Sequence, residues 1–226
     1  SLARRLHEKS TAMHDGVWNK SAAGSHEVRG RTLGIVGYGN IGSQLSVIAE
    51  ALGLSVIFYD IDDKLALGNA RKCATLEELL ADADVVSLHV DGRPGNAGLF
   101  GDHQMRAMKP RALFMNLSRG IAVDTEALSR HLKSGHIAGA ALDVFPVEPK
   151  AQGDPFESDL RGIPNVILTP HVGGSTEEAQ QDIGRFVASK LRAYAKAGTT
   201  NLSVTFPELN LPSDPARHRL AHVHEN

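Results

Sequence analysis

The chain has 226 residues, a formal net charge of −2 and a hydrophobic content of 42%. This length predicts one large domain, or one domain with appendages, and the small net charge gives no reason to expect nucleic acid or a membrane surface as a partner. The absence of a long apolar run predicts no membrane span. The single Cys73 excludes an internal disulfide framework and favours a reducing, cytoplasmic location. The first residue is Ser rather than Met, which suggests a fragment.

Strands and helices alternate along the sequence. The pattern Ser/Thr-x-x-Glu at 75–78 and again at 175–178 predicts two helix starts, and Asp124 predicts a third. Alternating strands and helices are typical of parallel sheets, so the order predicts an α/β fold with a doubly wound parallel sheet. The predicted helices are 2–13, 41–52, 75–83, 102–108, 124–133 and 175–198, and the predicted strands are 33–37, 55–59, 84–89, 112–117, 137–144 and 166–168.

Three glycines lie between the first predicted strand and the helix that follows it. Gly37, Gly39 and Gly42 have the spacing G-x-G-x-x-G, and the next strand ends at Asp60. In a dinucleotide site the first glycine allows a tight turn, the second lets the backbone approach a pyrophosphate, and the third lets the helix lie close to the strand. The helix N-terminus then offers N–H groups to the phosphates. The arrangement predicts a Rossmann-type site.

The acidic residues after the second strand predict which dinucleotide binds there. Asp60 can accept hydrogen bonds from the ribose hydroxyls of the adenosine half. Asp62 and Asp63 follow it, and no Arg or Lys appears before Lys64. Because a cluster of carboxylates repels a 2′-phosphate, we expect NAD rather than NADP.

Three reactive side chains follow three of the later strands. Arg119, Glu148 and His171 each lie just beyond a predicted strand end, where ligands bind in such sheets. A histidine can exchange a proton with a hydroxyl, a neighbouring carboxylate favours its protonated form, and an arginine can hold a carboxylate with two hydrogen bonds. Each residue alone is more often a surface group, but the three together predict hydride-transfer chemistry.

Several motifs together resemble the D-isomer-specific 2-hydroxyacid dehydrogenases. Within that family the chain is most similar to the bacterial branch that carries a C-terminal regulatory ACT domain. That resemblance implies NAD-dependent oxidation of 3-phospho-D-glycerate to 3-phosphohydroxypyruvate, the first step of phosphorylated serine biosynthesis. It covers essentially the whole chain and rests on the segments 37–42, 116–120, 141–149 and 169–176, with further similarity at 16–20, 59–61, 67–70, 201–202 and 206–208.

The resemblance also implies a role for each matching residue. Arg119 would bind the substrate carboxylate and carbonyl, His171 would act as the acid/base, and Glu148 would be its partner. No metal is implied. The residues expected to line the NAD site are Gly37, Tyr38, Gly39, Asn40, Ile41, Gly42, Asp60, His89, Leu117, Ser118, Arg119, Asp143, His171, Val172, Gly173 and Gly174.

The family architecture predicts four parts in this chain. Residues 1–27 would form an interdomain helix and a dimer-contact segment around Trp18, and residues 28–174 would form the NAD-binding domain. Residues 175–198 would be a long helix returning to a substrate domain, and residues 199–226 a linker and the start of an ACT-like module. We therefore expect a homo-oligomer. The loop 91–98 departs from the family, which normally has Pro after the strand and Thr later in the loop.

Two alternatives remain open. One is a related dehydrogenase that acts on glyoxylate or another 2-oxo acid. The other is an NAD-sensing interaction module of the corepressor type, which shares the fold and the Arg, Glu and His residues. The segment 16–20 and the ACT-like tail favour the phosphoglycerate enzyme. His218, His222 and His224 have a spacing that metal ligands can use, but no Cys or carboxylate set accompanies them.

Overall fold

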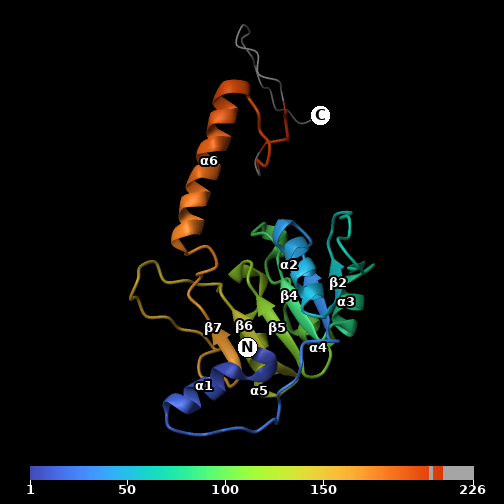
Figure 1. Ribbon diagram of the computed structural model, residues 1–226, viewed down its shortest axis with the longest axis vertical. Helices are drawn as coiled ribbons and strands as arrows, with labels where there is room; N and C mark the ends of the chain where they lie inside the picture. The colour runs from blue at the N-terminus through green and yellow to red at the C-terminus, as the bar shows by residue number, and fades with distance from the viewer. Residues whose placement is uncertain (204–205, 211–226) are drawn as a thin grey trace. The chain divides into compact units, whose positions relative to one another are not determined.

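The computed structural model describes residues 1–203 and 206–210 (Figure 1). The chain divides into two compact units, Ser1–His171 and Val172–Asn226. The predicted start of an ACT-like module, with its three histidines, lies almost entirely outside the described residues.

The first unit is built on a seven-stranded sheet in which every strand pair is parallel. The predicted doubly wound α/β fold is therefore confirmed. Six strands lie where the sequence pattern places them, and the short edge strand β3 is one that the pattern misses. In spatial order the strands are β3 (Arg71–Lys72), β2 (Ser55–Tyr59), β1 (Thr32–Val36), β4 (Val85–Leu88), β5 (Ala112–Asn116), β6 (Ile137–Leu142) and β7 (Val166–Leu168).

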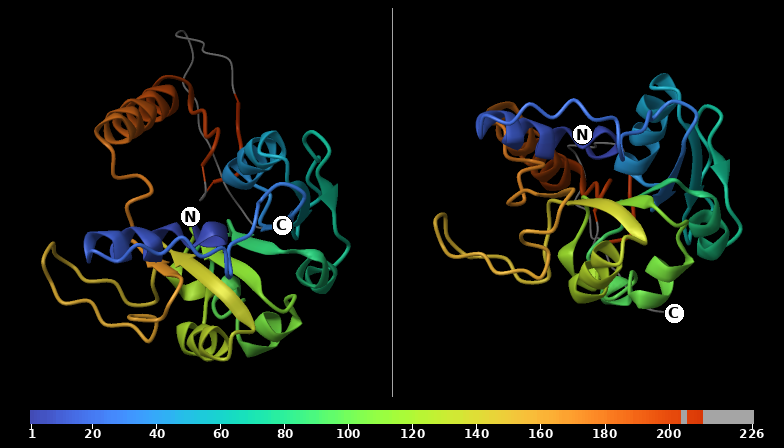
Figure 2. Two further views of the ribbon diagram at one scale, coloured as in Figure 1. Left: turned by 60° about the horizontal axis from the view of Figure 1, so that its bottom comes forward. Right: turned by 90° about the horizontal axis from the view of Figure 1, so that it is seen from below.

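Alternate residues of each strand enter two different cores, because successive side chains point to opposite faces of a sheet. Leu33, Ile35 and Phe58 pack on the face covered by α2 (Asn40–Ala51). Val36 and Ile57 point the other way, into the larger core. That core is closed by α3 (Leu76–Asp82), α4 (Asp102–Ala107) and α5 (Thr125–Lys133). Helices on both faces explain why the central strands are mainly apolar (Figure 2).

The helix ends agree with the predicted capping in part. Thr75 and Asp124 cap α3 and α5 through their side chains, as expected. The carboxylate of Glu78 does not return to the N-cap backbone but accepts from the Ala74 N–H at 2.8 Å. In the last helix the capping residue is Thr176 rather than Ser175.

The predicted N-terminal helix is divided in two. A 3₁₀ turn, Leu2–Arg4, is separated from α1 (Leu6–His14) by Arg5, whose φ is 52°. Further 3₁₀ turns occupy Pro94–Asn96 and Gly120–Ala122. Residues 17–22 form no helix or strand. The exposed Trp18 lies in this stretch, where 77% of its surface is accessible.

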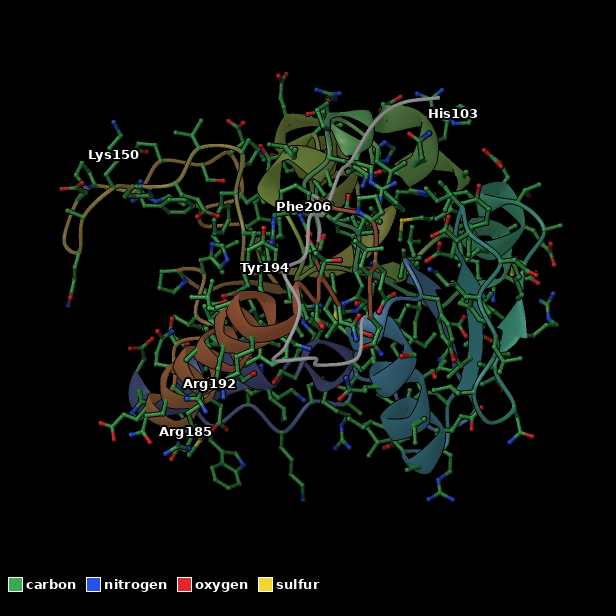
Figure 3. All side chains as sticks on the ribbon, turned by 90° about the horizontal axis from the view of Figure 1, so that it is seen from above. His103, Lys150, Arg185, Arg192, Tyr194 and Phe206 are labelled. Carbon is green, nitrogen blue, oxygen red and sulfur yellow. The ribbon has the colours of Figure 1, made fainter. Side chains whose placement is uncertain are left out.

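The second unit contains one long helix, α6 (Glu177–Ala197), which ends at Gly198 in the left-handed conformation that glycine favours. Figure 3 labels Arg185, Arg192 and Tyr194 along it. The helix carries a row of exposed apolar side chains: Ile183, Phe186, Val187, Leu191 and Tyr194. Within the described part of the chain, no helix has the length and apolar content that a bilayer span requires.

Candidate active site

The strand order creates a crevice beside β1. This strand has β2 on one side and β4 on the other. The chain therefore runs from β1 through β2 to β3 on one side of β1, and then crosses to β4 on the other side. Ligands bind at such a switch point, beyond the carboxyl ends of the strands. Gly37 follows β1 and donates its N–H to the Tyr59 carbonyl at 2.9 Å, while His89 follows β4 and donates to the Val36 carbonyl at 2.8 Å. These bonds hold the three strand ends together.

The three glycines of the turn have three different surroundings. Gly37 has φ 92°, and a Cβ there would lie 2.6 Å from the His89 carbonyl oxygen. A Cβ at Gly42 would overlap the Gly37 carbonyl. Gly39 faces open space and is the N-cap of α2, with no side chain capping that end of the helix. A pyrophosphate fits these features, because free N–H groups and an unobstructed backbone meet at Gly39.

This difference predicts opposite results for two alanine substitutions. Gly42→Ala should destabilise the fold by about 1–3 kcal/mol, because the new methyl group is forced into a packed turn. Gly39→Ala should change stability by less than about 0.5 kcal/mol, since its site is open, but should weaken NADH binding at least about tenfold. Thermal unfolding and fluorescence titration measure the two effects. Equal losses of stability in both variants would contradict this assignment of the glycines.

Asp60 is held in a fixed position at the end of β2. One carboxylate oxygen accepts from the Tyr38 N–H at 2.7 Å and the other from the Asp62 N–H at 2.9 Å. Each oxygen can accept a further hydrogen bond, so the carboxylate can still receive ribose hydroxyls. The side chain is oriented before any ligand arrives.

Asp60, Gly37, Gly39 and His89 line one pocket at this edge of the sheet. Burial lowers the pKa of His89, so its ring is neutral at physiological pH. Its Nε2 atom lies 2.9 Å from the Ser87 hydroxyl, and its buried Nδ1 atom has no hydrogen-bond partner within the part of the chain that the structure describes. An orphaned polar atom in a pocket fits a site that a polar ligand completes.

The remaining residues of the glycine segment differ in what they can offer. The ring of Tyr38 is buried, stacks on Phe58 at 3.7 Å and bonds to the Ser46 hydroxyl at 2.7 Å. Only its backbone is left to face a cofactor. Asn40 and Ile41 are exposed in the first turn of α2, where their backbone N–H groups are available. Their cofactor contacts remain predictions.

Asn116, which the sequence analysis does not assign to the site, organises the loop that carries Arg119. Its side-chain oxygen accepts from the N–H and hydroxyl of Ser118, at 3.1 and 2.9 Å, and its amide donates to the Arg119 carbonyl at 3.0 Å. Asn116 is fully buried, whereas Leu117 and Arg119 are exposed. The signal for Asn116 was its place inside the matched segment 116–120. It acts as a positioning residue for the exposed side chains.

Gly120 brings this loop against the next one. A Cβ at Gly120 would overlap the backbone of Phe145, so only glycine permits the close approach. The loop after Phe145 turns back through Glu148, whose Oε1 atom accepts from the Phe145 N–H at 3.0 Å. The loops that carry Arg119 and Glu148 are therefore packed together.

Glu148 and His171 form a hydrogen-bonded pair. The Nδ1 atom of His171 lies 2.9 Å from Oε2 of Glu148, with 51% and 37% of the two side chains exposed. His171 has φ 54°, a backbone conformation uncommon for a residue other than glycine and often found at functional positions. The contact with Glu148 leaves the Nε2 atom of His171 to face a substrate.

The pKa of Glu148 is lowered from its ordinary value. Partial burial opposes this shift, but the hydrogen bonds from His171 and from the Phe145 N–H outweigh it. The carboxylate is therefore ionised at neutral pH, and its hydrogen bond fixes the orientation of the His171 ring. The pair can thus exchange a proton with a substrate hydroxyl or carbonyl.

The other predicted cofactor residues follow β6 and β7. Asp143 is buried, and its Oδ1 atom accepts from the Thr169 hydroxyl at 2.6 Å. Thr169 is a second positioning residue that the sequence analysis does not assign. Val172, Gly173 and Gly174 belong to the second compact unit, and their contacts with a cofactor remain predictions.

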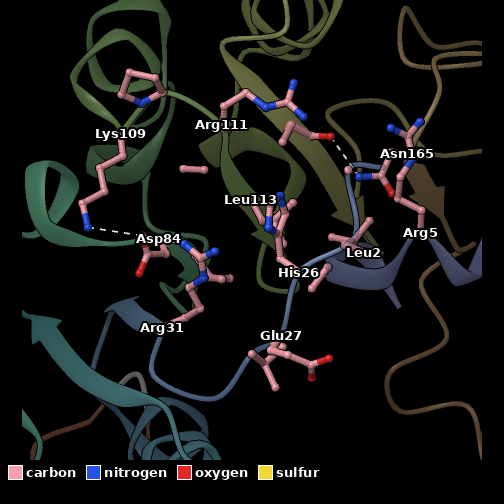
Figure 4. Close-up of a pocket in the computed structure, with 17 residues that line it drawn as sticks. Leu2, Arg5, His26, Glu27, Arg31, Asp84, Lys109, Arg111, Leu113 and Asn165 are labelled. Carbon is pink, nitrogen blue, oxygen red and sulfur yellow. Dashed lines mark hydrogen bonds and ion pairs between the residues drawn. The ribbon is translucent and has the colours of Figure 1, made fainter. Parts of the chain in front are cut away.

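Figure 4 shows a different pocket, which is lined by the N-terminal segment, including Leu2, Arg5 and His26, and by residues at the amino-terminal ends of the strands. Asp84, just before β4, lies 3.2 Å from Nζ of Lys109 and 3.8 Å from the Arg31 guanidinium. None of the predicted site residues lines this pocket. We place the chemistry at the opposite edge, because the glycine turn, Asp60 and the His171–Glu148 pair lie there. No group of three or more side chains suited to holding a metal ion occurs among the described residues.

Comparison with known proteins agrees with this geometry. The family model of the D-isomer specific 2-hydroxyacid dehydrogenase, NAD binding domain, matches residues 1–173. The chain is 53% identical to a D-3-phosphoglycerate dehydrogenase from Haemophilus influenzae and 52% identical to one from Escherichia coli, in each case over all of this chain and 55% of the relative. It therefore spans about half the length of the curated relatives it matches.

A solved structure shows the same fold with cofactor bound. It is the NAD-complexed D-isomer specific 2-hydroxyacid dehydrogenase from Lactobacillus delbrueckii ssp. bulgaricus, with a TM-score of 0.77 and 31% identity over 86% of this chain and 62% of that chain. The family match covers the glycine turn, Asp60, Arg119, Glu148 and His171. The chain belongs to the D-isomer specific 2-hydroxyacid dehydrogenases and carries the NAD-binding domain of that family.

Proposed function

We propose that the protein to which this chain belongs oxidises 3-phospho-D-glycerate to 3-phosphohydroxypyruvate with NAD, the first step of phosphorylated serine biosynthesis. The observation that carries the proposal is the His171–Glu148 pair at 2.9 Å, at the sheet edge that also holds the glycine turn. The relatives named D-3-phosphoglycerate dehydrogenase support the choice of substrate. The match covers only about half of each relative, so the activity is proposed for the whole protein.

The residues of the chain divide the work of the reaction. Arg119 holds the substrate carboxylate through paired N–H groups. The Nε2 atom of His171 accepts the proton of the substrate hydroxyl, and Glu148 stabilises the imidazolium that results. Bound NAD supplies the hydride acceptor. Asn116 and Thr169 hold the Arg119 loop and Asp143 in place.

A substrate panel tests the proposal. The full-length protein is mixed with NADH and, in turn, 3-phosphohydroxypyruvate, glyoxylate and other 2-oxo acids, and the loss of NADH fluorescence is followed. Turnover should be fastest with 3-phosphohydroxypyruvate. A clear preference for glyoxylate would favour a sister dehydrogenase. NADH binding without turnover of any substrate would favour an NAD-sensing module.

We propose also that the protein is a homo-oligomer with a contact around Trp18. This side chain is 77% exposed in a stretch without regular structure, and buried tryptophans are frequent anchors of interfaces. Trp18→Ala in the full-length protein should therefore weaken association by about 2 kcal/mol, or roughly 30-fold in the dissociation constant.

Light scattering over a range of concentrations measures the association. Leu65→Ala is the matched control, because Leu65 is 86% exposed and lies outside the N-terminal segment. A monomeric full-length protein, or equal association of wild type and Trp18→Ala, would rule out this contact.

The exposed face of α6 supports the predicted domain organisation. Its apolar residues, including Phe186 and Leu191, recur at helical spacing and are about half exposed. We infer that a substrate-binding part of the longer protein covers them, as the family architecture implies.

We propose a cytoplasmic location as well, since Cys73 is a buried free thiol that suits a reducing compartment.

A further inference from the structure

The loop 91–98 places an arginine in the pocket that holds Asp60. This loop departs from the family pattern, and its residues Asp91, Arg93 and Asn96 line the same pocket as Asp60, Gly39 and Lys64. An arginine near the ribose site matters, because arginine is the side chain that binds the 2′-phosphate of NADP in such folds.

The guanidinium of Arg93 is oriented by Asp91. Its Nε atom lies 2.8 and 2.9 Å from the two Asp91 carboxylate oxygens, and one Nη atom lies 2.6 Å from one of them. Asn96 fixes Asp91 in turn, through a hydrogen bond of 2.9 Å. The guanidinium has five N–H donors, and in the described structure its other Nη atom donates to no side chain or carbonyl. Arg93 is thus held in one orientation by Asp91, which offsets part of its positive charge, and it keeps N–H donors that this contact does not use.

Lys64 adds a second cation to the same pocket. Its Nζ atom pairs with Asp62 at 3.0 Å and has further N–H donors. The pKa of Lys64 is raised, chiefly by the hydrogen bond to Asp62, and Arg93 opposes this rise. The pKa of Arg93 is raised chiefly by Asp91, with smaller effects of Asp62 and Asp60. The two cations and Asp60 therefore lie close enough to act on one another.

The acidic cluster is weaker than its sequence indicates. From the sequence alone, Asp60, Asp62 and Asp63 are together expected to repel a 2′-phosphate. In the structure Asp62 is paired with Lys64 at 3.0 Å, and Asp63 with Lys72 at 2.8 Å. Among the described residues Asp60 forms no direct ion pair, and its hydrogen bonds come from two backbone N–H groups. Lys64 and Arg93 act on it only at longer range. The repulsion of a 2′-phosphate thus comes mainly from the carboxylate of Asp60.

We propose that Arg93, assisted by Lys64, is a specificity-determining residue that limits the preference of this chain for NAD over NADP. Asp60 binds the ribose hydroxyls of NAD and repels a 2′-phosphate, whereas Arg93 donates hydrogen bonds to that phosphate when it is present. The inference rests on the proposed NAD-dependent function. The chain binds NADH more tightly than NADPH, and Arg93 reduces the difference between the two dissociation constants.

The test is the ratio of the NADPH and NADH dissociation constants, measured by fluorescence titration of the full-length protein. Arg93→Gln should raise the ratio about tenfold, because a charge-assisted contact to the 2′-phosphate is lost. Asp60→Ser should lower the ratio at least tenfold, and adding Arg93→Gln to Asp60→Ser should restore most of it. The ratio cancels any effect of a substitution on folding or on adenine binding.

Arg130→Gln is the matched control. The side chain of Arg130 is 54% exposed like that of Arg93, and it is likewise paired with one carboxylate, but on α5 and outside the pocket. Its ratio should equal that of the wild type. An unchanged ratio in Arg93→Gln with normal NADH binding would overturn this inference and leave the proposed function intact. Failure of the wild type to bind NADH, or equal or tighter binding of NADPH, would overturn the NAD preference and this inference with it.

Discussion

Replacement of His171 by alanine in the full-length protein should lower kcat by about 10²–10⁴-fold, the usual contribution of a general acid/base. His171 is the ionisable ring paired with Glu148, and its Nε2 atom is the one directed away from that pair. NADH binding should persist, because the glycine turn and Asp60 are untouched. Steady-state kinetics and fluorescence titration on the same preparation measure both quantities.

His103→Ala is the control for this experiment. His103 is an exposed histidine on α4 and is not one of the residues of the predicted site. Its variant should have the kcat of the wild type. A near-normal kcat in His171→Ala would reject the acid/base assignment.

Arg119→Lys should mainly raise KM, because a lysine cannot make the paired contact with a carboxylate.

The 226-residue chain by itself should bind NADH and turn over no 3-phosphoglycerate. The turn, Asp60 and all seven strands of the sheet are present, so the cofactor pocket is complete at the switch point. Catalysis needs a substrate held within about 3–3.5 Å of the reacting groups. We expect Arg119 to hold the substrate carboxylate, and it is the only arginine or lysine among the three predicted catalytic residues. The relatives are nearly twice as long, and we expect the phosphate contact to come from the part not covered here.

The measurement is NAD reduction by the purified chain with 3-phosphoglycerate, beside the full-length protein as a positive control. NADH titration of the same sample establishes that the pocket is formed. Turnover by the short chain, after host enzymes have been removed, would falsify the view that a second substrate-binding part is required. Failure to bind NADH would contradict the reading of the pocket instead.

Local patterns in the sequence were enough to predict the parallel sheet and the glycine turn. The glycines at 37, 39 and 42 and the acid at 60 lie on one continuous stretch, and turn geometry and strand propensity act over such short distances. The order of strands and helices then implied a doubly wound sheet, since parallel strands need crossovers. The edge strand β3, with two residues, was too short to leave a pattern.

The description of the site required both the sequence motifs and the tertiary contacts. Sequence motifs nominated Arg119, Glu148 and His171, but they did not show that Gly120 must pack on the Phe145 backbone or that Asn116 holds the Arg119 loop. They also nominated Tyr38, but did not show that its ring is buried against Phe58, which leaves its backbone to face the cofactor. Such contacts join residues distant in the chain, so no local pattern records them.

By itself, the sequence determined the fold class, the position of the glycine turn and the kinds of reactive side chain at the strand ends, because these follow from local periodicity and residue chemistry. Only the tertiary structure decided which charges meet. Asp62, Asp63 and Asp91 form ion pairs with Lys64, Lys72 and Arg93, whereas the hydrogen bonds that Asp60 accepts within the described residues come from backbone N–H groups. Ion pairing depends on distances in space that the folded sheet and its loops set, and for this reason the charge balance at the cofactor pocket could not be read from the order of residues.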